Sequence, residues 1–300
     1  MGTLLDTRQL AQYLGINEKQ VYTLISDRGL PGTKVTGKWL FPRHLVDRWV
    51  EAHVANMPPE SPFLDRAEGL LLIAGSDDPL LVRTVGLYRN RYPEIIPLQS
   101  RAGSGEGLLA LKRGICHIAC VHLMNPGSED YNSSHLAETF AQDVVAVAFA
   151  HRTQGLVTAP GNPLGLRNLG DAIAGKVRWA GREEGTGTRL LFDREMDRLG
   201  LDPSTLADRI VAAGSHMEVG LAVLRGEAEA GMAIEAVSAL LGLGFVPVRE
   251  ERFDLVIRKA NFFRRPVQDL LGLLRTEEFG NMADTLAGYD VSLAGKVMYP

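Results

Sequence analysis

The first fifty residues of the chain carry apolar side chains at the three- and four-residue spacing of short amphipathic helices. This pattern predicts one helix over Arg8–Leu14 and a second over Glu18–Asp27. Thr7 and Asn17 stand where an N-cap side chain is expected. Gly15 can adopt the left-handed backbone conformation that ends the first helix. We therefore expect two short helices joined by a tight turn.

A hairpin and a third helix are predicted to follow. Thr33–Val35 and Lys38–Phe41 have the pattern of two short strands around Gly37. Pro42 favours the start of a helix over Arg43–Val54. The side chains of that helix expected to face inward are Leu45, Val46, Trp49 and Val50.

Beyond these elements the pattern changes. Residues 55–65 contain three prolines and no periodicity, which indicates a linker. From Gly69 onward, short apolar runs predict strands at residues 69–76, 95–100, 115–123, 144–150, 177–180, 210–213, 230–234, 245–248 and 253–257. Amphipathic stretches predict helices over residues 79–91, 108–114, 166–174, 188–199, 216–225, 237–243, 266–275 and 277–287. This alternation is typical of an α/β fold with parallel sheets.

Charge is divided unevenly between the two parts of this 300-residue chain. Residues 1–54 carry seven Lys/Arg against five Asp/Glu, whereas the remainder carries 25 against 31. Because phosphate contacts need local positive charge, any nucleic-acid contact is expected in residues 1–54. The sequence shows neither a secretory signal nor an apolar run long enough to span a bilayer, so we expect a cytoplasmic protein with no membrane partner.

The second predicted helix carries residues suited to reading DNA. In a helix-turn-helix, this helix enters the major groove and its first turns reach the base edges. Gln20 can pair with adenine, Thr23 can contact a thymine methyl group, and Lys19 can reach phosphate or guanine. The predicted DNA-binding residues are Lys19, Gln20, Tyr22, Thr23, Arg28, Lys34 and Lys38. The alternative is a small interaction module whose polar residues are only solvated.

The same segment resembles the MerR-like winged-helix domain of excisionase-type regulators. The matching residues are Leu5, Thr7, Leu14-Gly15-Ile16, Val21-Tyr22, Ile25, Gly29-Leu30-Pro31, Lys38-Trp39 and Phe41. The resemblance implies a winged helix-turn-helix domain at residues 1–54 that binds double-stranded DNA.

Three glycine-rich loops each follow a predicted strand and precede a predicted helix. They are Gly75-Ser76-Asp77-Asp78, Gly103-Ser104-Gly105-Glu106-Gly107 and Gly185-Thr186-Gly187-Thr188-Arg189. Backbone N–H groups at helix N-termini attract anions, and small hydroxyl side chains add donors. If the three loops converge, they predict an oxyanion site. Taken singly, each loop is explained by turn chemistry alone.

The C-terminal residues resemble the periplasmic-binding-protein-like domain that is fused to excisionase-type heads and is related to molybdate-binding proteins. The matching residues are Gly103-Ser104, Gly107-Leu108, Leu111, Gly114, His117-Ile118-Ala119, His122-Leu123, Tyr131-Asn132, Arg182, Gly185 to Arg189, Ala222-Val223, Gly226, Ala228, Ala230-Gly231, Ile234-Glu235, Gly242 to Pro247 and Glu251-Arg252. The resemblance implies a type II, two-lobed α/β domain over residues 66–300. Lobe one would span residues 66–146 and 248–300, lobe two would span 148–246, and strands near 144–150 and 245–248 would cross between them.

Such a domain binds its ligand between the lobes, at the carboxyl ends of strands. The expected ligand-binding residues are Ser76, Ser104, Gly105, His122, Tyr131, Thr186, Gly187, Thr188, Arg189 and Glu235. Arg189 can pair with an anionic ligand or with Glu184. The resemblance implies molybdate or tungstate as the ligand. A small carboxylate or a sulfur oxyanion is the next candidate. Glu183 and Glu184 oppose a simple tetraoxyanion unless they point away or hold a cationic group, so they suggest a ligand with some positive or hydrogen-donor character.

No metal, cofactor or catalytic site is predicted. Cys116 and Cys120, four residues apart on one strand, would be about 13 Å apart and so cannot share one zinc ion. The sequence contains neither Gly-x-Ser-x-Gly nor His-Glu-x-x-His.

These features together predict a ligand-responsive transcription regulator, acting as a homodimer that reads two DNA half-sites and binds a small anion. The alternative is a solute-binding module of molybdenum-cofactor or small-anion metabolism, whose N-terminal domain serves protein contacts.

Overall fold

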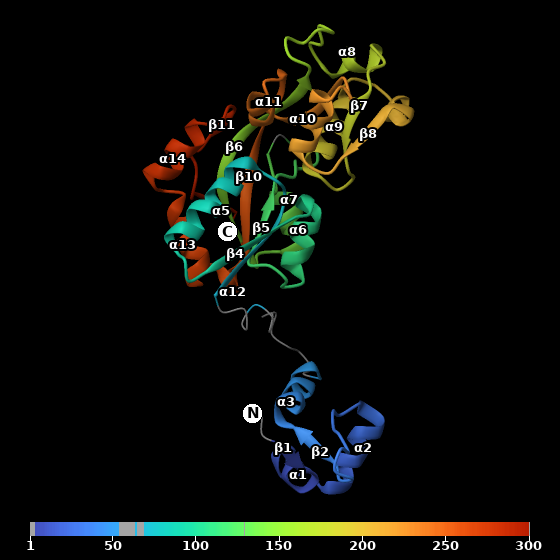
Figure 1. Cartoon of the computed structure of the whole chain (residues 1–300), viewed down its shortest axis with the longest axis vertical. Coiled ribbons are helices and arrows are strands. Elements are labelled where there is room, and N and C mark those ends of the chain that lie inside the picture. The colour runs from blue at the N-terminus through green and yellow to red at the C-terminus, as the bar shows by residue number, and fades with distance from the viewer. Residues whose placement is uncertain (1–3, 54–63, 65–68, 129, 300) are drawn as a thin grey trace. The chain divides into compact units, whose positions relative to one another are not determined.

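The computed structural model describes residues 4–53, 64, 69–128 and 130–299 of the chain (Figure 1). The chain forms two compact units, Met1–Glu60 and Ser61–Pro300. We call their described parts the head and the body. The predicted linker at residues 55–65 lies outside the described residues, except for Leu64. Leu64 is buried, and its carbonyl oxygen accepts a hydrogen bond from Arg264 Nη1 at 2.9 Å.

The head combines helices with a small antiparallel sheet. Its elements are β1 (Leu4–Asp6), α1 (Thr7–Leu14), α2 (Glu18–Arg28), β2 (Leu40–Pro42) and α3 (Arg43–Ala52). The two strands pair with each other. Apolar side chains from all of these elements enclose a core around Leu10, Val21, Phe41 and Val46.

The first two helices of the head, α1 and α2, each begin with a capping box. Asn17 caps α2 as predicted, and Gly15 ends α1 with a φ of 66°. The prediction of Thr7 as the first N-cap was wrong, because Asp6 takes that position. The Asp6 carboxylate accepts from Gln9 N–H at 2.8 Å, and Gln9 Oε1 accepts from Asp6 N–H at 2.9 Å. This reciprocal pair leaves Thr7 as the first helical residue.

The predicted hairpin is present only in part. Thr33 forms a single bridge to Leu40, across a turn in which Gly37 N–H donates to Lys34 O at 2.9 Å. The strand partner of β2 is β1, which the sequence did not predict because three residues are too few to show an alternating pattern. Val50 was predicted to face inward but is 41% exposed, because the face of α3 that packs on the core is centred on Val46.

Within the described residues, the body is built on one ten-stranded mixed sheet. The strands are β3 (Leu70–Gly75), β4 (Ile96–Arg101), β5 (Ile118–Val121), β6 (Val144–Thr158), β7 (Trp179–Arg182), β8 (Ile210–Ala213), β9 (Ala230–Ile234), β10 (Gly244–Arg258), β11 (Tyr289–Asp290) and β12 (Val297–Tyr299). Neighbouring strands run in the order β4-β3-β5-β10-β6-β9-β7-β8, and β11 and β12 pair with β6.

Helices connect and cover these strands. They are α5 (Pro79–Arg91), α6 (Gly103–Lys112), α7 (Ser133–Phe140), α8 (Leu169–Ala174), α9 (Gly187–Arg198), the 3-10 helix η1 (Pro203–Arg209), α10 (His216–Leu224), α11 (Glu235–Leu241), α12 (Lys259–Phe262), α13 (Arg265–Leu273) and α14 (Glu277–Asp284). The predicted α/β class is confirmed. The sequence pattern missed α7, α12, η1, β11 and β12.

Two long strands join the halves of the sheet. The sequence predicted a strand ending at Ala150 and two separate strands at residues 245–248 and 253–257. The structure shows two continuous strands of 15 residues, β6 and β10, paired along their length. The prediction failed because Arg249–Arg252 and His151–Thr153 are polar, although their backbones remain in the ladder.

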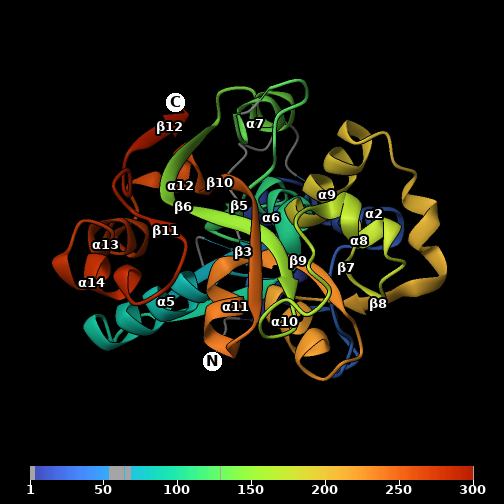
Figure 2. The same cartoon turned by 90° about the horizontal axis from the view of Figure 1, so that it is seen from above.

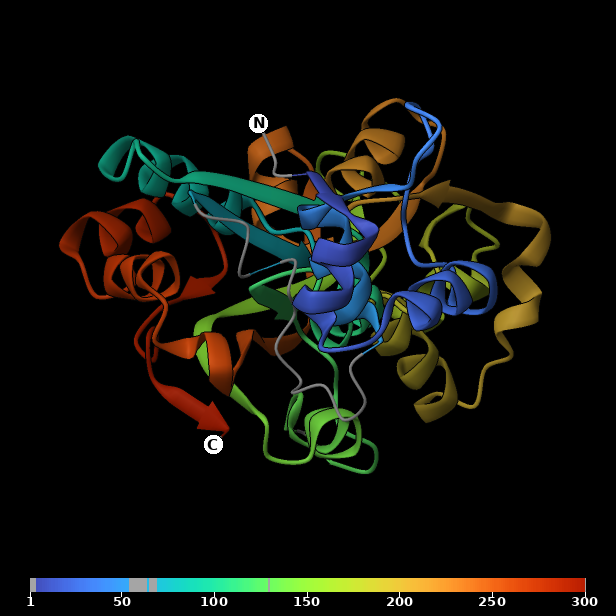
Figure 3. The same ribbon diagram turned by 90° about the horizontal axis from the view of Figure 1, so that it is seen from below.

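The halves on either side of these strands are called lobe one, with β3, β4 and β5, and lobe two, with β7, β8 and β9. Figure 2 shows β6 and β10 lying between α5, α13 and α14 on one side and α8 and α9 on the other. In lobe one, α5 packs against α13 and α14, which lie next to it in Figure 3. Separate apolar cores fill the two lobes, around Phe149 and Phe279 in lobe one and around Trp179 and Phe192 in lobe two.

Candidate functional site

The three glycine-rich loops meet where the two lobes approach each other. Ser76 follows β3, and Ser104 lies in the first turn of α6, with their Oγ atoms 2.7 Å apart. Ser104 Oγ also accepts from His122 N–H at 3.2 Å. Gly105 N–H donates to Gly185 O at 3.4 Å, which joins the second loop to the third. The structure therefore brings together loops from both lobes.

Close packing explains why these loops are rich in glycine. The predicted loop Gly103–Gly107 is instead the beginning of α6, which starts at Gly103. A Cβ atom on Gly107 would lie 2.6 Å from Gly75 Cα, so this turn of α6 can pack on β3 only without a side chain there. A Cβ atom on Gly187 would collide with the His122 ring. Lobe two thus touches His122 through bare backbone.

His122, at the end of β5, is held by a buried carboxylate. Its Nδ1 lies 2.9 Å from Glu251 Oε2, and Gln154 Nε2 donates to the same oxygen at 2.6 Å. Burial opposes ionisation of Glu251, but His122, Arg152 and Gln154 together lower the pKa of its carboxyl to about 2. Burial lowers the pKa of His122, against the effect of Glu251. The neutral ring therefore donates from Nδ1 and leaves Nε2 as an acceptor.

Arg152 connects this pair to the rest of lobe one. Its fully buried guanidinium donates from Nε to Glu251 Oε1 and from Nη1 to Asp78 Oδ2, both at 2.6 Å. Tyr289 OH donates to the same Asp78 oxygen at 2.6 Å. Arg152 lies on β6, Glu251 on β10 and Tyr289 on β11, and Asp78 is the N-cap of α5. The network therefore links the middle of the crossing strands to the start of α5 and to β11.

Arg182 lies at the end of β7 and is only 9% exposed. Its Nε and Nη1 atoms are buried and lack a hydrogen-bond partner in the described part of the chain. Burial lowers the pKa of the guanidinium, while Asp77 acts in the opposite direction. Asp77 itself forms an ion pair with Arg101, with Nε and Oδ1 at 3.3 Å. The Arg182 guanidinium is therefore a buried cation, two nitrogens of which have no hydrogen-bond acceptor in the described residues.

Further buried polar atoms of the body also lack hydrogen-bond partners in the described residues. Thr188 Oγ1, on the first turn of α9, is buried and has no partner in the residues described. The same holds for His216 Nδ1 at the start of α10 and for Gln154 Oε1 on β6. The rings of His122 and His216 are 6.4 Å apart, across the two lobes. We call Arg182, Thr188, His216, Gln154 and His122, with Ser76 and Ser104, the junction site.

Buried polar groups in folded proteins nearly always have hydrogen-bond partners, because an unsatisfied group costs about 1–3 kcal/mol. Several such groups at one place indicate complementarity to a small polar molecule. The sequence prediction missed Arg182, Gln154 and His216. Arg182 was visible as a match of the resemblance, but its burial depends on the packing of lobe two and leaves no local signal.

Other predicted ligand residues already have partners within the protein. Arg189 Nε donates to both Asp193 oxygens, at 2.8 and 3.0 Å, instead of pairing with Glu184. Thr186 Oγ1 donates to Glu183 O at 2.8 Å and accepts from Arg189 N–H at 3.3 Å as the N-cap of α9. Glu183 and Glu184 are exposed, and Glu183 lies near enough to Arg182 to act on the pKa of its guanidinium.

Tyr131 and Glu235, which were also predicted to bind the ligand, contact other parts of the body. Tyr131 OH donates to Glu250 O at 3.2 Å, on a crossing strand. Glu235 begins α11 and packs on Gly288, where an added Cβ atom would lie 2.7 Å from Glu235 Oε2.

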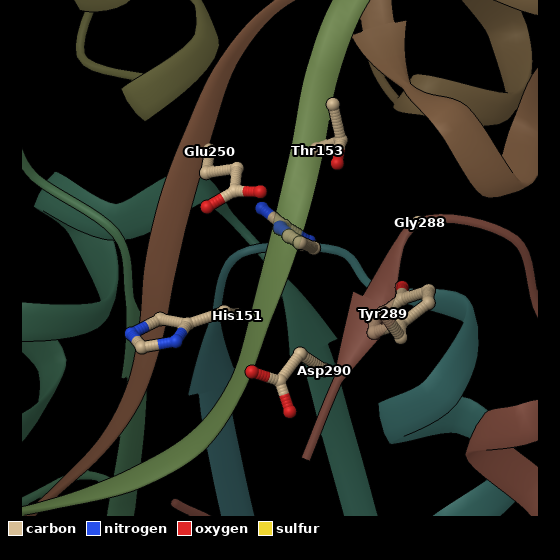
Figure 4. A pocket seen from close by; sticks show the side chains of 7 residues that line it. His151, Thr153, Glu250, Gly288, Tyr289 and Asp290 are labelled. Carbon is tan, nitrogen blue, oxygen red and sulfur yellow. The ribbon is translucent and has the colours of Figure 1, made fainter. Parts of the chain in front are cut away.

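A separate pocket of about 210 Å³ is formed where β6, β10 and β11 meet (Figure 4). Its lining residues are His151, Arg152, Thr153, Glu250, Gly288, Tyr289 and Asp290. Glu250 and Asp290 are exposed. The pocket is thus more open than the junction site.

On the head, all seven predicted DNA-binding side chains are exposed, whereas Val21 on the opposite face of α2 is fully buried. Gln20 has a second role, because its Oε1 accepts from Asn17 N–H at 3.1 Å in the capping box. Adenine would have to share that oxygen. Lys34 Nζ lies 5.0 Å from the centre of the Trp39 ring, which holds the lysine beside the turn.

This architecture defines a protein with a helix-turn-helix unit and a two-lobed α/β body of the solute-binding type. Residues 4–54 match the model of a helix-turn-helix domain, and residues 85–275 match that of the PBP superfamily domain. The chain belongs to the PBP superfamily. The combination of both domains fits a ligand-binding, DNA-binding regulator. No helix in the described residues is long and apolar enough to cross a membrane.

Similar proteins support the fold of the body. Uncharacterized protein YvgK of Bacillus subtilis (strain 168) is 26% identical over 203 residues, which are 67% of this chain and 65% of YvgK. The chain thus spans less than two thirds of that relative. A putative phosphate ABC transporter substrate-binding protein with bound phosphate from Clostridium perfringens has a TM-score of 0.57 at 15% identity, covering 77% of this chain and 99% of that one. The CcmR regulatory domain of Synechocystis PCC6803, in complex with 2-PG, has a TM-score of 0.51 at 15% identity, covering 69% and 95%.

Proposed function

We propose that this chain is a ligand-responsive transcription regulator that binds double-stranded DNA through its head and a small anion at the junction site. The observation that carries the proposal is Arg182, a buried guanidinium whose Nε and Nη1 atoms have no partner in the described residues. It lines the same pocket as Thr188, whose hydroxyl is also unpartnered there. A planar guanidinium with free donors matches the two oxygens of a carboxylate or oxyanion. An anion at this position would satisfy both residues at once.

The candidate ligands are molybdate, tungstate and small carboxylates. The resemblance to molybdate-binding proteins supports the first two, and the solved structures similar to the body hold phosphate and 2-PG. Among the residues named from the sequence, Ser76, Ser104 and His122 belong to this site with Thr188. In this proposal Arg182 pairs with the anionic ligand, a role that the sequence analysis assigned to Arg189.

Ligand binding can reach the head only if it changes the balance between conformations of the body. A hydrogen bond between the two lobes would be gained or lost when the body changes conformation. Arg194, on α9 of lobe two, donates from Nη1 to Ser128 O at 2.8 Å on the loop after β5 of lobe one. An anion that bridges Arg182 and the turn at Ser104 would favour the conformation in which the two lobes make this contact. In a homodimer, closure would change the spacing of the two heads on their half-sites.

The anion site is tested by a matched pair of arginine variants. We expect Arg182→Gln to weaken binding of the best anion among phosphate, molybdate, tungstate and acetate by about tenfold or more, because a charged, buried hydrogen-bonding group is lost. Arg189→Gln should leave it unchanged, since that guanidinium is held by Asp193. Isothermal titration calorimetry on the full chain gives the affinities. Equal losses in both variants, or no anion binding, would contradict the proposal.

A further inference from the structure

The unpartnered atoms of the junction site include an acceptor whose orientation is fixed. Gln154 is fully buried, and its Nε2 donates to Glu251 Oε2 at 2.6 Å. Because an ionised carboxylate can only accept, the amide cannot be flipped without losing this bond. Gln154 Oε1 must then point elsewhere, and it has no partner among the described residues.

A second acceptor belongs to His122. Its Nδ1 is engaged by the same Glu251 oxygen, at 2.9 Å, which fixes the tautomer and leaves Nε2 able to accept. The Gln154 amide and the His122 ring therefore both hydrogen-bond to the same oxygen, Glu251 Oε2. Arg182 and Thr188, from lobe two, supply donors instead. The site thus offers donors on β7 and α9 and acceptors on β6 and at the end of β5.

Charged side chains of both signs lie around the site. Arg152 pairs with Asp78 and Glu251. Burial lowers the pKa of Arg182, and the carboxylates of Asp77, Glu218 and Glu183 act to raise it. These carboxylates already compensate the buried cations, so an anion must gain its affinity from the unpartnered donors of Arg182 and Thr188.

We infer that the ligand of the junction site is a small anion that also carries a hydrogen-bond donor, such as a hydroxy acid or hydrogen phosphate. This inference rests on the proposed anion site. The anionic group binds Arg182 and Thr188, and the donor binds Gln154 Oε1. Molybdate, tungstate, sulfate and simple carboxylates lack such a donor. Each of them would leave the buried amide oxygen unsatisfied, which disfavours binding.

Pairs of probes that differ only in the donor test this inference. Calorimetry on the full chain compares glycolate with acetate and hydrogen phosphate with sulfate. We expect the donor-bearing member of at least one pair to bind about tenfold or more tightly. The pair that discriminates also tells whether the ligand is an organic acid or a phosphate. Equal affinities within both pairs, or tighter binding of acetate and sulfate, would overturn the inference.

A variant assigns the discrimination to Gln154. Gln154→Met keeps the length of the side chain but removes Oε1, together with the Nε2 donor to Glu251. It should abolish the preference while acetate or sulfate still binds. Gln268→Met, on the exposed face of α13, serves as the matched control and should keep the preference. A preference that survives in Gln154→Met also overturns the inference. Anion binding without discrimination contradicts this inference alone, whereas the absence of any anion binding contradicts the proposed function.

Discussion

Arg182 lies just before the glycine-rich loop that ends at Arg189, yet the surroundings of the two side chains differ completely. Arg189 has Asp193 four residues further along α9, at the spacing where opposite charges on a helix meet. That pairing was readable in the sequence and argues for a structural role. Arg182 is buried by lobe two, and no residue close to it in sequence indicates this. Residue type and spacing therefore located the right loop, but only the packing identifies the unpartnered cation.

His117 is a buried histidine whose effect on the stability of the fold should depend on pH. Leu72 N–H donates to His117 Nδ1 at 2.9 Å, which requires an unprotonated ring nitrogen, and burial lowers the pKa of His117 from 6.5 to about 4. Between these values the unfolded chain binds a proton that the folded chain does not. The contribution of His117 to stability is therefore complete above about pH 6.5 and is lost as the pH falls towards 4.

Urea unfolding between pH 7 and pH 4 measures this effect. We expect His117→Asn, whose side-chain oxygen can replace Nδ1 as an acceptor, to lose about 2–3 kcal/mol less stability than the native chain over that interval. Parallel stability curves for the two proteins would show that His117 is not held neutral in the fold.

At the scale of elements, the sequence predicted most strands and helices of the body, because apolar runs and amphipathic stretches alternate clearly there. It failed where tertiary contacts decide. The polar middle of β10 around Glu251 resembles a loop, yet it is paired throughout with β6 and holds the network under the junction site. The Gly103–Gly107 run resembles a loop because Gly107 serves the close approach of α6 to β3, while Gly103 and Gly105 face the turn at Gly185 and Thr186.

The approach of α9 to β5 can be tested by adding one methyl group. Gly187→Ala places a Cβ atom against the His122 ring, so we expect anion affinity to fall by about tenfold, as overpacking costs about 1–3 kcal/mol. Thermal stability should change little, because alanine favours helices and the lobes can separate slightly. Gly280→Ala on α14, where a Cβ atom meets nothing within 4 Å, is the control. Unchanged affinity in Gly187→Ala would show that anion binding does not need this contact.

For the whole molecule, the two units have distinct characters. The head presents exposed lysines and polar side chains on α2 and the turn after Thr33, and the body carries buried, unpartnered donors between its lobes. If the two act together, occupancy of the junction site must alter DNA affinity, and the alteration must depend on Arg182. Non-specific attraction between lysines and phosphates would instead depend on salt alone.

The central claim is tested most directly by fluorescence anisotropy with a labelled duplex that the full chain has selected from random sequence. Glycolate or hydrogen phosphate is titrated at constant ionic strength. We predict that the tighter-binding anion changes the DNA dissociation constant by about fivefold or more, which is the range of ordinary coupling between two sites. The same titration should leave DNA binding by Arg182→Gln unchanged. A chain that binds no duplex at low salt, or an equal response in the variant, would contradict the account.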